Sequence, residues 1–240
     1  MIAYGDRARL GVLVPSGNTV AEPELRAMLP PEVSLVVTRL PLRGSSEAEL
    51  LGMAGSLETA AGLLADAQPD AIAFHCTAVT TFDPALAEDL RRRIEAATGL
   101  PALATSDALL AAVAALGGRR VLLVTPYIEA VHAREVAFLE ANGVRVAGGS
   151  CMGIAANSEM ARVAPSAIAA QARAALASAP DADLCLVSCT AIRSGAVIDG
   201  LEAELGLPVV TSNQALAWHA LRALGLREPV QGFGRLLGRS

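Results

Sequence analysis

Short apolar segments alternate with longer amphipathic or Ala-rich segments along the whole sequence. The short segments are too brief for helices, so we interpret them as buried strands. The longer segments begin with Ser, Asp, Asn or Pro and with acidic residues, which are helix start signals. This alternation predicts an α/β fold with parallel sheets. The expected strands are residues 9–15, 33–40, 71–76, 101–105, 120–125, 144–147, 184–189 and 208–211.

The expected helices fill the segments between these strands. Residues 148–156 are interpreted as a loop, and the Gly-rich residues 226–240 as an irregular tail. One helix begins at Glu22, and the others are expected over residues 45–67, 83–97, 108–116, 126–142, 157–179, 196–205 and 213–224.

The second half of the sequence repeats landmarks of the first half in the same order and at nearly the same spacing. Several ordered matches at one offset indicate a duplicated unit. We therefore expect two similar lobes, residues 1–116 and 117–212, with residues 213–240 packing back on the first lobe. The matched landmarks are Arg9 with Arg119, Cys76-Thr77 with Cys189-Thr190, and Gly99-Leu100-Pro101 with Gly206-Leu207-Pro208.

Composition narrows the functional classes. The net charge is −5, aromatic residues make up only 3%, and no Lys/Arg-rich block occurs, so nucleic-acid binding is not expected. The longest apolar run, residues 108–116, is far below the roughly 20 residues of a membrane span, and the first strand begins too early for a signal peptide. Four cysteines in 240 residues do not form a disulfide framework, so a cytoplasmic location is expected. The three histidines are scattered, and no metal site is expected.

Cys76 and Cys189 end two of the expected strands. Ligands of open α/β sheets bind at the carboxyl ends of strands, so we expect both thiols to face one cleft between the lobes. The helix N-terminus after each cysteine would lower its pKa. The alternative is that both are core cysteines, as we interpret Cys185; Cys151, in a loop, has no assigned role. His75 should point to the opposite face of its strand from Cys76, so a Cys-His dyad is not expected.

Other polar residues follow strands or begin helices. The segment Ser16-Gly17-Asn18-Thr19 could bind an anion or form an ordinary turn. Tyr127, which corresponds to Gly17 in the repeat, could donate a hydrogen bond into the cleft or pack at a helix start. Asn157 and Asn213 could contribute to the site or only cap helices.

Several segments together carry a family resemblance. They are Pro15-Ser16-Gly17-Asn18-Thr19, Glu22-Pro23-Glu24, the two Cys-Thr pairs, Thr125-Pro126-Tyr127, Gly153-Ile154, Asn157, Met160-Ala161-Arg162-Val163 and Gly232-Phe233-Gly234-Arg235-Leu236. With these segments the chain resembles the aspartate/glutamate racemase superfamily over nearly its whole length. Within that superfamily it is similar to the branch of maleate cis-trans isomerases and arylmalonate decarboxylases.

The resemblance implies two Rossmann-like lobes with pseudo-two-fold symmetry, an active site between them, no cofactor, and a homodimer. It also implies that Cys76 and Cys189 are catalytic. A small dicarboxylate or related acid would be held by Pro15, Ser16, Asn18, Thr77, Ala78, Tyr127, Asn157, Thr190 and Ala191.

For an isomerase of this branch, the thiolate of Cys76 would add to maleate, the new single bond would rotate, and fumarate would be eliminated, with Cys189 as acid–base partner. Decarboxylases of the branch keep only the second cysteine and lack the first-loop Asn, whereas this chain has Cys76, Cys189 and Asn18. Conversely, residues 74–79 differ from the Cys-Thr-Ser-Gly pattern of maleate isomerases, and residues 123–127 look decarboxylase-like. The expected function is maleate isomerisation. A two-cysteine racemase, a decarboxylase and a non-catalytic acid-binding protein are the alternatives.

Overall fold

The computed structural model describes residues 4–239 and contains two four-stranded parallel sheets, which confirms the expected α/β class. Near-complete burial of the central strands explains their continuous apolar sequences, because helices cover both faces of a parallel sheet. The first sheet has the order β2-β1-β3-β4 and consists of β1 (Ala8–Pro15), β2 (Val33–Leu40), β3 (Ala71–Phe74) and β4 (Ala102–Ala104). The second has the order β6-β5-β7-β8 and consists of β5 (Arg120–Tyr127), β6 (Arg145–Ile154), β7 (Leu184–Val187) and β8 (Val209–Thr211).

Helices follow each strand and cover the sheets. In the first half they are α1 (Ala21–Met28), α2 (Glu47–Gly52), the 3₁₀ turn η1 (Met53–Ser56), α3 (Leu57–Ala65), α4 (Thr77–Thr80), α5 (Pro84–Thr98) and α6 (Thr105–Ala115). In the second half they are α7 (Glu129–Ala141), α8 (Asn157–Met160), α9 (Pro165–Ser178), the 3₁₀ turn η2 (Gly195–Val197), α10 (Ile198–Leu205), α11 (Ser212–Ala223) and α12 (Gly234–Leu237).

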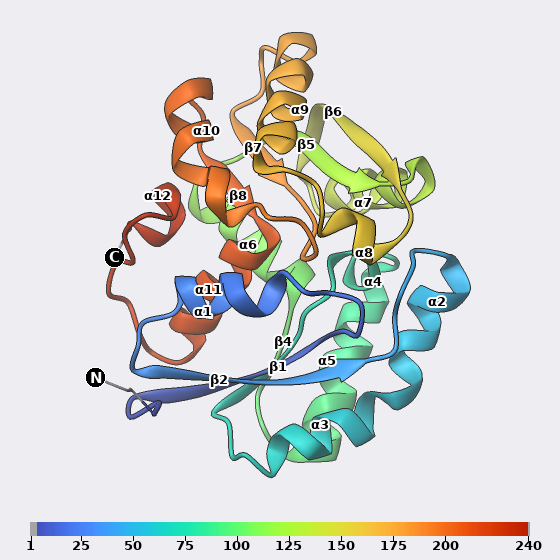
Figure 1. The fold of residues 1–240 in the computed structure, drawn as a ribbon, viewed down its shortest axis with the longest axis vertical. Coiled ribbons are helices and arrows are strands. Elements are labelled where there is room, and N and C mark those ends of the chain that lie inside the picture. The colour runs from blue at the N-terminus through green and yellow to red at the C-terminus, as the bar shows by residue number, and fades with distance from the viewer. Residues whose placement is uncertain (1–3, 240) are drawn as a thin grey trace.

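The two sheets form separate parts of the molecule, joined by helices (Figure 1). The first sheet with α3 and α5 occupies the lower part of the view, and the second sheet with α9 and α10 the upper part. Helix α11 follows β8, the last strand of the second sheet, but it packs against two helices of the first half. These are α1, which connects β1 to β2, and α6, which follows β4. Helix α11 therefore joins the two halves.

The ends of corresponding helices have the same local structure in both halves. Helices α5 and α10 end at Gly99 and Gly206, whose φ angles of 71° and 70° are left-handed and unstrained only for glycine. One turn earlier, the carboxylates of Glu95 and Glu202 each accept a backbone N–H from the following strand. The duplication seen in the sequence is therefore repeated in hydrogen-bonding detail.

Some expected elements differ from the structure. The segment expected to be a loop, residues 148–156, instead continues β6 to Ile154, so Cys151 lies on an edge strand. The two glycines there are needed for close packing: a Cβ at Gly149 would lie 2.3 Å from the carbonyl oxygen of Leu123, and one at Gly148 would lie 2.6 Å from the Cβ of Ala179.

Three further expectations about helices are wrong in part. The single helix expected over residues 45–67 is divided into α2, η1 and α3, and the one expected over residues 157–179 is interrupted between α8 and α9, where Pro165 begins a new helix. The expected irregular tail contains the short helix α12. Strand β3 ends at Phe74 rather than at Cys76, and α4 begins directly after the cysteine.

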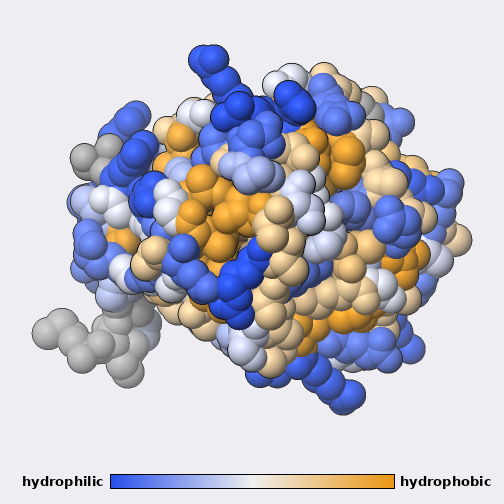
Figure 2. Space-filling view, turned by 90° about the horizontal axis from the view of Figure 1, so that it is seen from above, coloured by the Kyte–Doolittle hydropathy of each residue, from blue (hydrophilic) through white to orange (hydrophobic). Residues whose placement is uncertain are grey.

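On the face drawn in Figure 2, hydrophobic residues form patches between hydrophilic ones. None of the helices described is both long and apolar enough to cross a membrane.

Candidate active site

Cys76 and Cys189 line one small, closed cavity between the two halves. Cys76 follows β3 and Cys189 follows β7, so corresponding strands of the two sheets deliver the sulfurs. The cavity is nearly filled by its own lining, because its volume is only about 20 Å³, roughly the space of one water molecule. Its other lining residues are Pro15, Leu42, Gly44, Ser45, Leu50, Thr77, Ala78, Tyr127, Asn157, Met160, Thr190 and Ala191.

Backbone groups surround the thiol of Cys76, which is only 5% exposed. Cys76 is the residue before the first turn of α4, and the N–H groups of Ala78 and Val79 donate to its sulfur. These bonds favour the thiolate, but burial has the larger effect and raises the pKa of Cys76 to about 12. The expectation of a lowered pKa is therefore wrong for the closed cavity.

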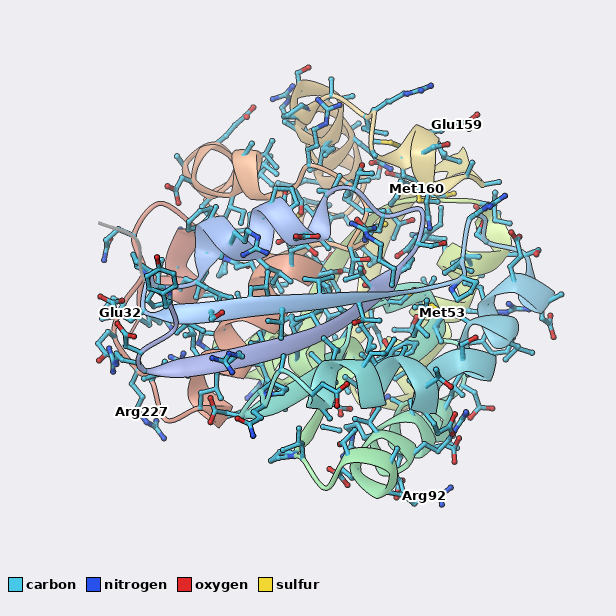
Figure 3. All side chains as sticks on the ribbon, turned by 60° about the horizontal axis from the view of Figure 1, so that its bottom comes forward. Glu32, Met53, Arg92, Glu159, Met160 and Arg227 are labelled. Carbon is cyan, nitrogen blue, oxygen red and sulfur yellow. The ribbon has the colours of Figure 1, made fainter. Side chains whose placement is uncertain are left out.

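Cys189 is equally buried but has side-chain partners as well. The N–H of Ala191 donates to its Sγ at 3.2 Å, and the hydroxyl of Tyr127 also donates to it. The Sδ of Met160 lies 3.9 Å from the same sulfur; Figure 3 labels Met160 on α8. Burial again dominates and raises the pKa of Cys189 to about 12. The pKa of Tyr127 is raised well above its usual value, by burial first and then by the charge of Cys189.

Two of the residues expected to hold the substrate lie outside the cavity lining. The hydroxyl of Ser16 contacts the backbone of Leu42, beside a separate open pocket. The amide of Asn18 is fully used: its oxygen accepts N–H groups from α1, and its nitrogen donates to the carbonyl and hydroxyl oxygens of Thr190, both at 3.0 Å. Asn18 thus ties the first loop to the segment that follows Cys189.

The other expected residues line the cavity, and all of their polar groups are uncharged. They are Pro15, Thr77, Ala78, Tyr127, Asn157, Thr190 and Ala191. The amide nitrogen of Asn157 has only a weak contact, 3.5 Å from the carbonyl oxygen of Leu42, so it can turn toward a ligand. An anion in the cavity would be held by N–H, hydroxyl and amide donors rather than by a cation.

Buried polar residues connect the segments that carry the two cysteines. His75 points away from Cys76, as expected: its Nδ1 lies 3.0 Å from the hydroxyl of Thr105, and its Nε2 lies 2.8 Å from the amide oxygen of Asn213. The Asn213 amide nitrogen donates to Glu24 at 2.7 Å and to the carbonyl oxygen of Thr190 at 3.3 Å. Burial lowers the pKa of His75 to about 4, so the ring is neutral and Nε2 carries the hydrogen.

Glu24 of α1 lies at the far end of this series of hydrogen bonds. Its carboxylate accepts the N–H of Gly195 at 2.8 Å in addition to the Asn213 amide. Burial raises its pKa, although these hydrogen bonds act in the opposite direction. Asn213 is therefore a connector between the halves rather than a residue of the cavity lining.

Part of the site was not predicted from the sequence. One cavity wall belongs to a segment that looked like an ordinary connection into a helix and consists of Leu42, Gly44, Ser45 and Leu50. The fully buried acid Glu135 on α7 was not predicted either. The available signal was its place among Val131, Phe138 and Leu139, an apolar stripe at helical spacing.

Among the residues that the structure describes, no group of three or more His, Cys, Asp or Glu side chains is arranged to hold a metal ion.

Comparison with known proteins decides the family. The sequence model of the arylmalonate decarboxylase family matches residues 10–237. The chain belongs to this family. The maleate isomerase of Nocardia farcinica (strain IFM 10152) is 34% identical over 244 residues, which cover 95% of each chain. The arylmalonate decarboxylase of Bordetella bronchiseptica is 39% identical over 145 residues, 60% of each chain.

A solved structure of the family is also similar. The Nocardia farcinica maleate cis-trans isomerase, in a cysteine-to-serine variant with a covalently bound succinylcysteine intermediate, aligns with a TM-score of 0.90 at 28% identity and covers 96% of this chain and 98% of its own. The resemblance stated from the sequence is thus confirmed. This member of the family is an enzyme, either an isomerase or a decarboxylase.

Proposed function

We propose that the protein converts maleate, or a closely related small cis-dicarboxylate, into its trans isomer. The observation that carries this proposal is the pair of thiols, Cys76 and Cys189, lining one cavity. Two sulfurs on one small ligand can act on its two alkene carbons, one as nucleophile and the other as acid. The succinylcysteine intermediate of the Nocardia relative supports addition of a cysteine to the alkene.

The reaction would begin with the thiolate of Cys76. Its sulfur forms a bond to one alkene carbon, the π electrons move toward the carboxylate of the other carbon, and that carbon takes the proton of the Cys189 thiol. The alkene is now a single bond, which can rotate. The Cys189 thiolate then removes a proton from the same carbon, the C–S bond breaks, and its electrons return to Cys76 as the trans alkene forms. Proton and charge balance after each cycle.

Neutral donors would stabilise the negative charge that develops during addition. The Tyr127 hydroxyl and the N–H groups that follow each cysteine lie around the cavity, together with the amide of Asn157. Such preorganised donors act strongly in a closed site from which water is excluded. Because the thiols have raised pKa values in the closed cavity, the thiolate would form most easily before the cavity closes on its ligand.

The second candidate is decarboxylation of an arylmalonate-type acid, favoured by the 39% identity to the Bordetella enzyme. A decarboxylase would need only one sulfur, Cys189, to return a proton to carbon. Cys76 would then have no chemical task.

Proton NMR of a maleate solution tests the first proposal. The purified protein should produce fumarate, and Cys76→Gly should not. If no fumarate appears, but phenylmalonate loses CO₂ and Cys76→Gly keeps that activity, the second candidate replaces the first.

A further inference from the structure

The buried acid Glu135 has no evident structural partner. Its side chain is 0% exposed on the inner face of α7, and neither carboxyl oxygen has a well-formed hydrogen bond within residues 4–239. Buried polar groups of this kind are rare and costly, so each one calls for an explanation. The polar group that faces the carboxyl is the hydroxyl of Ser188, the residue directly before Cys189.

A row of hydroxyl groups leads from the cavity to this acid. The hydroxyl of Thr77 donates to the Oγ of Ser212 at 2.9 Å, which also accepts the N–H of Cys189 at 3.1 Å. The Ser212 hydroxyl can then donate its own hydrogen to the Oγ of Ser188, 3.4 Å away. The Ser188 hydroxyl can in turn donate its hydrogen to the carboxylate of Glu135. The row can therefore direct its hydrogens toward an ionised carboxylate.

The titratable groups on which Glu135 acts lie around the second thiol, Cys189. Its negative charge acts on Tyr127 of β5 and on Cys189, whose pKa values it raises, whereas the causes that set the pKa of Cys76 do not include it. On its own helix, His132 bonds the hydroxyl of Thr125 at 2.9 Å. The Arg134 side chain lies over the Phe82 ring and pairs with Glu47.

On the remaining strand beside α7, the thiol of Cys151 is occupied by Glu129. No cation therefore pairs with Glu135 among these described neighbours, and of the two thiols its charge acts on Cys189.

We propose that Glu135 makes the two thiols unequal: its carboxylate, lying behind Cys189, keeps the proton on Cys189 and leaves the thiolate to Cys76. In terms of bonds, one proton moves from the sulfur of Cys76 to the sulfur of Cys189, and the pair carries one negative charge before and after. This inference rests on the proposed function, in which Cys76 is the nucleophile and Cys189 the acid. Glu135 is a positioning residue, because it acts through Cys189 and does not touch the cavity.

Burial raises the pKa of Glu135 to about 7, which makes the bias dependent on pH. Above pH 7 the carboxylate is charged and opposes a thiolate at Cys189. At pH 5.5 the group is neutral, and the opposition disappears.

Site-resolved alkylation tests this inference without relying on turnover. The protein is treated with a small amount of iodoacetamide at pH 8 and at pH 5.5, and mass spectrometry of the peptides gives the ratio of label on Cys76 to label on Cys189. Wild type should favour Cys76 at pH 8. In Glu135→Gln this ratio should fall at least about threefold, because one pKa unit changes thiol reactivity by about the square root of ten at a Brønsted slope near 0.5.

The control is Glu140→Gln, an exposed acid on the same helix, which should keep the wild-type ratio. The ratio in wild type should also fall between pH 8 and pH 5.5, a comparison that does not require the variant to fold. Equal labelling of both cysteines in wild type at pH 8, or the same preference in wild type and Glu135→Gln, would overturn the inference. Maleate turnover by wild type, measured separately, decides the proposed function itself.

Discussion

The ends of β3 and β7 have the same backbone plan but give their cysteines different surroundings. At Cys76 the donors are the backbone N–H groups of α4. At Cys189 one backbone N–H is joined by the Tyr127 hydroxyl and the sulfur of Met160, with Glu135 behind. Duplication of the fold explains why two sulfurs meet, whereas side chains outside the repeat determine how each sulfur behaves. The position that corresponds to Tyr127 is Gly17, where a Cβ would already lie 3.1 Å from the carbonyl oxygen of Leu42.

The largest expected effect comes from exchanging either sulfur for oxygen. Cys76→Ser and Cys189→Ser should both abolish conversion of maleate to fumarate, because a serine hydroxyl is a far weaker nucleophile and acid than a thiol. Only Cys189→Ser, which retains the nucleophile, should gain the mass of one maleate in intact-protein mass spectrometry. An adduct on Cys76→Ser instead would reverse the roles of nucleophile and acid assigned to Cys76 and Cys189.

Removal of the Tyr127 hydroxyl should have the next largest effect. Tyr127→Phe deletes the only side-chain donor to Cys189 among residues 4–239 and should lower kcat by about 10²-fold, the usual cost of a preorganised donor in a closed site. Tyr4→Phe, at a residue that is 73% exposed, is the matched control. If kcat is unchanged while KM rises, Tyr127 contributes to binding and not to the chemical step.

Glu135→Gln should stabilise the protein in a pH-dependent way. A carboxyl whose pKa rises from 4.5 to about 7 on folding costs stability as pH increases through that interval, because the folded state must release a proton that it holds more tightly. The variant should exceed wild type by about 3 kcal/mol at pH 8 in urea unfolding, and the two should converge at pH 4. A gain of the same size at both pH values would mean that the charge of Glu135 is not its source.

The smallest expected effect is a loss of stability, and it should be equal in the two halves. Gly99→Ala and Gly206→Ala each place a Cβ in open space at a left-handed φ and should each cost about 1 kcal/mol, measured by urea unfolding. Activity should stay at the wild-type level, since both glycines lie at the far end of helices α5 and α10 from the cavity. Unequal costs would show that the two scaffolds differ in rigidity as well as in chemistry.

Much of the fold could be predicted because buried parallel strands are continuous apolar runs. Strand β2 has the expected bounds, residues 33–40, and the ordered matches indicated the duplication. The start of strand β6 was predicted, but its continuation over residues 148–154 was missed because Gly148 and Gly149 are typical of loops, yet here they allow close contact with β5 and α9. A contact between residues distant in sequence leaves no such local signal.

The candidate site could be predicted only as far as its local motifs extend. The two Cys-Thr pairs and Tyr127 stand at strand ends, which a sequence reveals; their catalytic roles remain predictions. Asn18 looked like a substrate ligand because its partner, Thr190, is remote in sequence. The raised pKa values of the thiols depend on burial, which is a property of the assembled halves and not of either motif.

The contact of α11 with α6 has a consequence for the order in which the chain can fold. Helix α6 is made before the middle of the chain, but the helix that covers it begins only at Ser212. During synthesis from the N-terminus, the apolar surface of α6 therefore stays exposed until nearly the whole chain has left the ribosome. The first half cannot finish its own core alone, and a nascent chain stalled before Ser212 should be a substrate for chaperones.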